Sequence, residues 1–137
     1  MVMIDSKKEI IDKIKIINHD EGDGNPAEVG QLVHINITGY DEEGTLFYKN
    51  NILHPMKIIA GDESQGPGPG YIRGLVYGVI GIKQNQKRTI IFPPELGYNI
   101  PKEKRGKNDV PELGPNGLNL DSYIVMELEC KYIQNGI

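Results

Sequence analysis

Hydrophobic and polar residues alternate between residues 32 and 38, so an extended chain would place the hydrophobic ones on one face. These are Val33, Ile35 and Ile37, with His34, Asn36 and Thr38 between them. A period of two is that of a strand with one buried face. Downstream, Ile72, Leu75, Val76 and Val79 recur at the spacing of one helical face. The pattern predicts a strand over residues 32–38 and a short helix that begins near Ile72.

Further strands are predicted from short β-branched or apolar runs that end at turn residues. They are Thr45–Tyr48, Met56–Ile59, Lys87–Phe92 and Tyr123–Ile133. Pro93 and Pro94 end the third run, because proline cannot donate a hydrogen bond to a neighbouring strand. The alternation of these runs with turns indicates a sheet built mainly from antiparallel neighbours.

The N-terminal isoleucines fit two different structures. Ser6 and Glu9 have the spacing of a capping box, which would start a short helix. The residues that follow would equally suit the start of a strand: Ile10, Ile11, Ile14, Ile16 and Ile17. The pattern alone leaves both structures open.

Two segments are predicted to be loops. Gly66–Gly70 alternates glycine with proline, which excludes regular structure; a phosphate-binding loop is also excluded, because proline has no N–H donor. Residues 99–121 are polar and interrupted by prolines, and a loop of this length inside a compact domain is usually functional. With the helix and strands above, these loops predict an α+β fold: a twisted antiparallel β-sheet wrapped around one short helix.

Composition restricts the classes of partner and compartment. A chain of 137 residues usually forms one core. The net charge of -4 gives the chain no reason to bind nucleic acid or an anionic membrane. The single cysteine, Cys130, favours a reducing compartment. We expect a cytoplasmic protein, also found in the nucleus, because residues 1–5 turn charged too early for a signal peptide.

No metal site is expected, because the three histidines are far apart in the sequence and lack the paired ligands of a zinc site. They are His19, His34 and His54. The sequence also carries no serine elbow or other signature of a catalytic triad. These absences favour a site that needs neither a metal nor an acid-base pair.

Three runs between residues 71 and 98 stand in a characteristic order. They are Tyr71-Ile72-Arg73-Gly74-Leu75, Gly81-Ile82-Lys83, and Lys87 onward to Pro93-Pro94-Glu95-Leu96-Gly97-Tyr98. This order resembles the FKBP-type peptidyl-prolyl cis-trans isomerases, in which a short helix, a strand and a pocket tyrosine follow one another. Gly44–Phe47 upstream and Tyr123–Ile133 downstream also fall in the family's order. The resemblance covers residues 13–134 and leaves residues 1–12 as an N-terminal extension.

The resemblance implies an apolar pocket for proline. Phe47, Ile72 and Tyr98 stand where the family has pocket residues of the same type, and they are the predicted catalytic residues. The other predicted substrate-binding residues are Ile37, Tyr48, Met56, Tyr71, Leu75 and Met126. Five of these depart from the family, which typically has tyrosine at Ile37, aspartate at Tyr48, phenylalanine at Met56, tryptophan at Leu75 and phenylalanine at Met126.

The implied activity is rotation of X-Pro peptide bonds in protein folding, without a cofactor, at a modest rate because of these departures. The alternative is an FKBP-like interaction module or chaperone with little or no catalysis, and fold alone does not choose between them. The implied partners are proline-containing peptides or protein clients, and macrolides such as tacrolimus or rapamycin, bound weakly. We expect a monomer.

Overall fold

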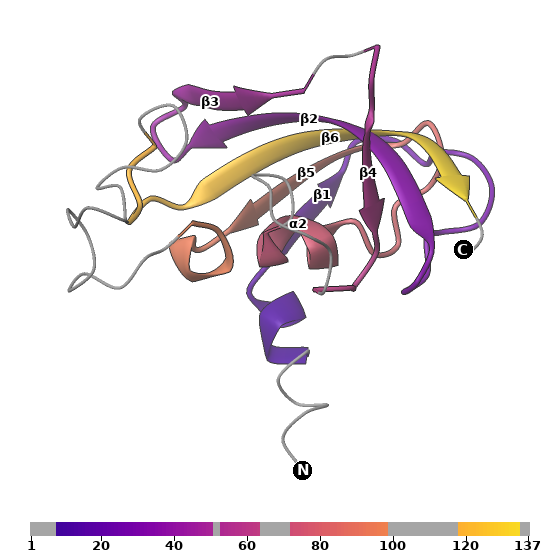
Figure 1. The fold of residues 1–137 in the computed structure, drawn as a ribbon, viewed down its shortest axis with the longest axis horizontal. Helices are drawn as coiled ribbons and strands as arrows, with labels where there is room; N and C mark the ends of the chain where they lie inside the picture. The colour runs from indigo at the N-terminus through magenta and orange to yellow at the C-terminus, as the bar shows by residue number, and fades with distance from the viewer. Residues whose placement is uncertain (1–7, 51–52, 64–71, 99–117, 135–137) are drawn as a thin grey trace.

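The computed structural model of the chain describes residues 8–50, 53–63, 72–98 and 118–134. Six strands in these ranges form one sheet that arches over a short helix (Figure 1). The elements are β1 (Lys15–Asn18), β2 (Leu32–Asp41), β3 (Leu46–Lys49), β4 (Met56–Ile59), α2 (Arg73–Gly78), β5 (Lys87–Phe92), the 3-10 helix η1 (Pro94–Leu96) and β6 (Ile124–Gln134). The predicted fold class is confirmed.

The strands lie in the order β1-β5-β6-β2-β3, and β4 also pairs with β2. Every pairing is antiparallel. The long strands β2 and β6 form the middle of the sheet, with Ile35 opposite Cys130 and Ile37 opposite Leu128. This register places the hydrophobic residues of both strands on the same face, which is the face toward α2.

The alternation in β2 is the one that the sequence predicts. Val33 and Ile35 are fully buried and Ile37 is 1% exposed, whereas Asn36 and Thr38, on either side of Ile37, are partly exposed. The strand is longer than predicted and continues to Asp41. Its inner face meets the buried residues of β5, β6 and α2 in a single core.

Helix α2 lies close against β5 because two of its residues are glycines. A Cβ at Gly74 would lie 2.4 Å from the ring of Phe92, and one at Gly78 would lie 2.6 Å from Cδ1 of Ile90. Gly74 and Gly78 are four residues apart and so share a helix face. The spacing of these glycines therefore sets how closely the helix backbone approaches the sheet.

Arg88 of β5 contacts the end of α2. Its side chain is buried, and its guanidinium donates to the carbonyls of Gly78 and Ile80 at 2.9 Å each. It also donates to Oδ1 of Asn18 at 2.7 Å. Burial lowers the pKa of Arg88, since no carboxylate of the described residues pairs with it. The last carbonyls of a helix otherwise lack partners, so Arg88 acts as its C-terminal cap.

The N-terminal isoleucines form both structures that the sequence pattern left undecided, a helix and a strand. Residues 8–12 are helical, and Lys15–Asn18 pairs with β5. Ile10 packs against the core and Ile14 belongs to it. The 3-10 helix after Pro93 was not predicted, whereas the end of β5 at this position is confirmed.

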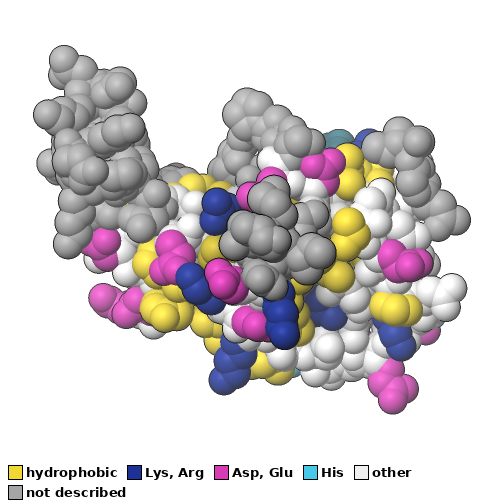
Figure 2. Space-filling model, turned by 90° about the horizontal axis from the view of Figure 1, so that it is seen from below, with side chains coloured by type: hydrophobic (Ala, Val, Ile, Leu, Met, Phe, Trp, Pro, Cys, Tyr) yellow, Lys and Arg dark blue, Asp and Glu magenta, His cyan; other side chains and the backbone are white. Residues whose placement is uncertain are grey.

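The predicted loop Gly66–Gly70 lies outside the described residues, and so does most of the predicted loop 99–121, of which 118–121 are described. In the described part of the chain, no helix is long and apolar enough to cross a membrane. Seen from below, Lys and Arg side chains are interspersed with Asp and Glu, and neither sign of charge gathers into a patch (Figure 2).

Candidate functional site

Most residues of the predicted pocket belong to one apolar cluster on the inner face of the sheet. The buried members are Ile37, Phe47, Ile72, Leu75 and Met126, and the partly exposed members packed against them are Tyr48, Met56 and Tyr98. Tyr71 lies outside the described residues. These residues come from β2, β3, β4, β6, from α2 and its N-cap, and from the segment after η1, so only the tertiary fold gathers them.

Phe47 lies over a glycine of the neighbouring strand. A Cβ at Gly39 of β2 would lie 2.9 Å from Cζ of the Phe47 ring. The pairing of β2 with β3 also changes register between Gly39 and Tyr40. Gly39 therefore provides the space that Phe47 occupies. Gly39 was not predicted to take part in the site, although a single glycine within a strand pattern often marks such a close approach.

Tyr98 reaches the same place from the other end of the sheet. It follows η1. A Cβ at the preceding residue, Gly97, would lie 2.4 Å from Cδ1 of Ile124. The rings of Phe47 and Tyr98 meet edge to face, with centroids 6.1 Å apart and planes at 85°. Burial, and then the nearby Tyr48, raise the pKa of the Tyr98 hydroxyl. The hydroxyl therefore stays protonated and remains a hydrogen-bond donor at neutral pH.

Ile72 brings a backbone donor to the cluster. It is the N-cap of α2, with an extended backbone, and its carbonyl accepts from the N–H groups of Leu75 and Val76 at 3.1 and 3.0 Å. The N–H of Ile72 itself has no acceptor within the described residues. An apolar wall, a phenolic hydroxyl and a backbone N–H thus belong to one cluster.

Glu63 ties the end of the β4 segment to α2. Its carboxylate accepts from Nε of Arg73 at 3.0 Å and from the hydroxyl of Tyr77 at 2.5 Å. Burial, with a further contribution from Glu63, raises the pKa of Tyr77 to about 12. Arg73 was named only within the run of residues that carries the family resemblance, and Glu63 and Tyr77 were not predicted to take part.

The cluster has a covered layer and an outer layer. Leu75 and Met126 are 0% exposed and Ile37 is 1% exposed, so these three shape the cluster from within. Tyr48, Met56 and Tyr98 are partly exposed, so they form the surface of the cluster. Such a surface suits an apolar ring that carries a carbonyl, because it combines apolar contact with hydrogen-bond donors. In the part of the chain described, no group of three or more His, Cys, Asp or Glu is arranged to hold a metal ion.

Comparison with known proteins identifies the family of this chain. Residues 24–115 match the family described as FKBP-type peptidyl-prolyl cis-trans isomerase. The chain belongs to this family. The match covers Phe47 with the Gly39 beneath it, helix α2 and the segment that ends at Tyr98. The resemblance predicted from residues 71–98 is therefore confirmed.

Two curated FKBP relatives align with most of this chain. It is 33% identical over 113 residues to FK506-binding protein 3 of Yarrowia lipolytica, covering 82% of this chain and 25% of that protein. It is 27% identical over 121 residues to the 39 kDa FK506-binding nuclear protein of Drosophila melanogaster, covering 88% of this chain and 29% of that protein. The chain thus spans between a quarter and a third of the length of these FKBP relatives.

Proposed function

We propose that residues 13–134 form a peptidyl-prolyl cis-trans isomerase domain of modest activity. The observation that carries the proposal is the edge-to-face pair of Phe47 and Tyr98 on an otherwise apolar cluster. Family membership supports the class of reaction. The low identity to the named relatives leaves the activity itself to be tested.

The chemistry explains why an apolar site suffices. Rotation about an X-Pro bond breaks amide resonance, with a barrier of roughly 18–20 kcal/mol, and the twisted amide has a less polar carbonyl than the planar one. An apolar pocket favours that twisted state over the ground state. Stabilisation of about 4 kcal/mol would accelerate rotation about a thousandfold. Neither a cofactor nor a titrating acid or base takes part.

In this proposal the proline ring contacts Met56, Phe47 and the edge of Tyr98. The Tyr98 hydroxyl donates to a substrate carbonyl, and the Ile72 N–H provides a second donor. Met56 and Met126 keep the pocket apolar but are flexible, which reduces preorganisation. Leucine at 75 in place of the family's tryptophan removes aromatic surface in the same region. These are the reasons for a modest rate.

The proposed partners are proline-containing peptides and protein clients. In this proposal the chain is a monomer and binds them in the cytoplasm or nucleus. One FKBP relative is named as a nuclear protein, which fits the second compartment. Both relatives are named for binding FK506. We propose weak binding of such macrolides here, because Tyr48 occupies the position where the family typically offers a carboxylate to a ligand.

The test is exchange NMR on a short apolar-Pro peptide with the purified chain. Acceleration of cis/trans exchange is expected. Tyr98→Phe should slow the catalysed rate roughly 2- to 10-fold, since a lost hydrogen bond costs about 0.5–1.5 kcal/mol. Met56→Glu should slow it further, because it places an unpaired charge at the partly exposed apolar surface.

Lys57→Gln is the matched control for Met56→Glu. It changes the net charge by the same amount at the adjacent, exposed position of β4 and should leave the rate unchanged. Exchange rates equal to those without protein, even at high protein concentration, would refute the enzyme. If the peptide nevertheless binds and Met56→Glu abolishes that binding, the domain is the interaction module that the sequence left as the alternative.

A further inference from the structure

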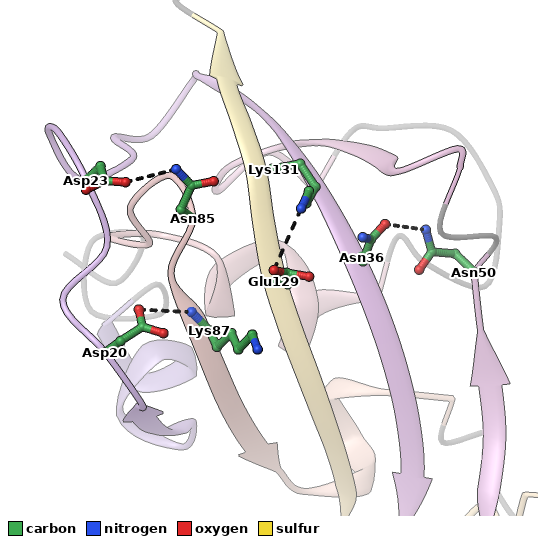
Figure 3. A network of polar contacts seen from close by, with 8 residues as sticks. All are labelled: Asp20, Asp23, Asn36, Asn50, Asn85, Lys87, Glu129 and Lys131. Carbon is green, nitrogen blue, oxygen red and sulfur yellow. Dashed lines mark hydrogen bonds and ion pairs between the residues drawn. The ribbon is translucent and has the colours of Figure 1, made fainter.

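A polar hollow lies on the outer face of the sheet, opposite the apolar cluster. Its volume is about 370 Å³. Its floor is formed by the residues of β2, β5 and β6 that alternate with the core residues. Across the sheet, Lys87 stands opposite Glu129, and Glu129 opposite Asn36. Figure 3 shows these three side chains in a row on three neighbouring strands, with α2 behind the sheet.

A second row lies one step along the same strands. Thr89 stands opposite Glu127, Glu127 opposite Thr38, and Thr38 opposite Lys49 of β3. His19 bounds the hollow at one side, where its Nε2 lies 2.7 Å from Oγ1 of Thr89. The hollow therefore has carboxylates along its middle strand and an ammonium group at either end.

The orientation of the Asn36 amide follows from its neighbours. The Ile37 N–H can only donate, so the Asn50 atom 2.6 Å from it is the oxygen. The other atom of the Asn50 amide is then the nitrogen, which also donates to the carbonyl of His54 at 3.2 Å. Asn50 Nδ2 donates to Asn36 at 3.4 Å, so that Asn36 atom is its oxygen (Figure 3). The Asn36 nitrogen thus points the other way.

This nitrogen is buried and has no hydrogen-bond partner among the described residues. A buried donor without an acceptor is costly, and such groups in a native structure call for an explanation. In Figure 3 the Asn36 amide and Glu129 face each other across the pair of strands, but no hydrogen bond joins them. Glu129 instead pairs with Lys131 at 3.7 Å. An acceptor brought by a ligand would satisfy the Asn36 amide once the side chains that cover it move aside.

Three charges around the hollow lack an ion-pair partner. Among the described residues, the side chains of Lys49, Lys87 and Glu127 take part in no ion pair. The contact of Lys87 with Asp20 is made by its backbone N–H, at 3.3 Å. Among the described residues, the hollow thus offers two unpaired cations, one unpaired anion and one unused amide NH2 group.

We propose that this hollow binds a free acidic amino acid, a small molecule with two carboxylates and one ammonium group. The two carboxylates complement Lys49 and Lys87, and one of them accepts from the Asn36 amide. The ammonium group complements Glu127. The carboxylates on the middle strand disfavour a nucleic acid, and the two lysines disfavour a metal ion. The site lies on the other face of the sheet from the proposed proline pocket and does not depend on it.

The test is a titration of the isotope-labelled chain with L-glutamate, followed by the NMR signals of the Asn36 side-chain amide and of Lys87, Glu127 and Glu129. Exposed ion pairs are individually weak, so we expect saturation with a Kd of about 1 mM. Sodium chloride at equal ionic strength is the control. Shifts that fail to saturate, or that the salt reproduces, would overturn the proposal.

The complementarity makes a sharper prediction with a second probe. Glutarate has both carboxylates but no ammonium group, so it should bind less tightly than L-glutamate to the natural chain. Glu127→Gln should weaken the binding of L-glutamate roughly 2- to 5-fold and should tighten the binding of glutarate. Lys15→Gln, a charge change on the same sheet outside the hollow, should affect neither probe. An unchanged preference in Glu127→Gln would contradict the assigned role of Glu127.

A tripeptide that begins with glutamate is the third probe, because it keeps the ammonium group and the side-chain carboxylate but loses the α-carboxylate. We expect the tripeptide to bind less tightly than L-glutamate. Tighter binding would overturn the proposal of a free amino acid and would indicate a peptide ligand instead. Asn36→Val removes the unused donor while Asn50 keeps its bonds to Ile37 and His54. This variant should lose L-glutamate binding without a lower urea midpoint. A large drop in that midpoint would show that the Asn36 amide is structural.

Discussion

Tyr98 lies edge to face on Phe47, with ring centroids 6.1 Å apart, although the two residues belong to opposite ends of the sheet. Phe47 comes from β3 at one edge, and Tyr98 follows η1, which extends from β5 near the other edge. The curvature of the sheet over α2 brings them together (Figure 1).

A double-mutant cycle should detect this ring contact. Phe47→Leu and Tyr98→Leu are each expected to lower the free energy of unfolding, and the interaction between them should be about 0.5–1.5 kcal/mol. Urea unfolding of the four proteins measures it. Phe47 and Tyr132 form the control pair, because the Tyr132 ring contacts His34, which lies further along β2 from Phe47. Their substitutions should have additive effects on the free energy of unfolding. Additivity for the Phe47 and Tyr98 pair would mean that the contact adds nothing beyond burial.

Arg88→Met tests the cap on α2. Methionine fills similar space but leaves the carbonyls of Gly78 and Ile80 without their donor. We expect the free energy of unfolding to fall by about 3 kcal/mol, since each unsatisfied buried group costs about 1–3 kcal/mol. Arg88→Lys should recover only part, because one ammonium group cannot reproduce the planar set of donors. A loss below about 1 kcal/mol would show that water replaces the guanidinium.

Gly74→Ala and Gly78→Ala test the close approach of α2 to β5. Alanine normally stabilises a helix interior by about 0.5–1 kcal/mol over glycine. At Gly74 the new methyl would meet the rigid Phe92 ring at 2.4 Å, so we expect a net loss of about 1–3 kcal/mol. Gly78→Ala should cost less, because the atom it meets is the flexible end of Ile90. Phe92→Leu should partly rescue Gly74→Ala, and equal effects at the two glycines would contradict this explanation.

Tyr77 predicts how stability changes at alkaline pH. Its pKa is about 12 in the folded chain against an ordinary value of 10.0 for tyrosine, so folding favours the protonated hydroxyl. This contribution is complete below pH 10 and is lost as the pH rises toward 12, because the unfolded chain releases the proton first. Tyr77→Phe should therefore lose less stability than the natural chain between about pH 9 and about pH 11. Urea unfolding at the two pH values measures the difference, and equal losses would argue against this role of Tyr77.

The strands and the helix could be predicted because their patterns are local. The alternation through Val33, Ile35 and Ile37 has only one extended solution that buries all three, and Lys87–Phe92 is bounded by prolines on one side. The N-terminal isoleucines lack such a constraint. Their strand exists because Lys15 and Ile17 find partners in Ile91 and Thr89, which no local pattern reveals.

For the candidate site, the sequence determined which residue types stand at which positions. The order of residues 71–98 predicted the family, and Phe47, Ile72 and Tyr98 followed from that resemblance. Only the tertiary structure decided how they meet: Gly39 makes room for the Phe47 ring, and Gly97 admits Ile124 beside Tyr98. Those spacings depend on cross-strand register, because residues far apart in the chain become neighbours only when the sheet has formed.

The sequence by itself determined the alternating faces of the sheet, the helix and the family, because periods and motifs act over a few residues. The tertiary structure alone decided what those faces do. Arg88 falls at a core-facing position of β5 and is stable there only because α2 ends next to it and brings the carbonyls of Gly78 and Ile80 to its guanidinium. Asn36 lies on the outer face by alternation, but its unused donor and the unpaired charges around it arise from the pairing of β2, β6 and β5. Hydrogen-bond partners and charge neighbours are properties of that pairing, and local sequence cannot specify them.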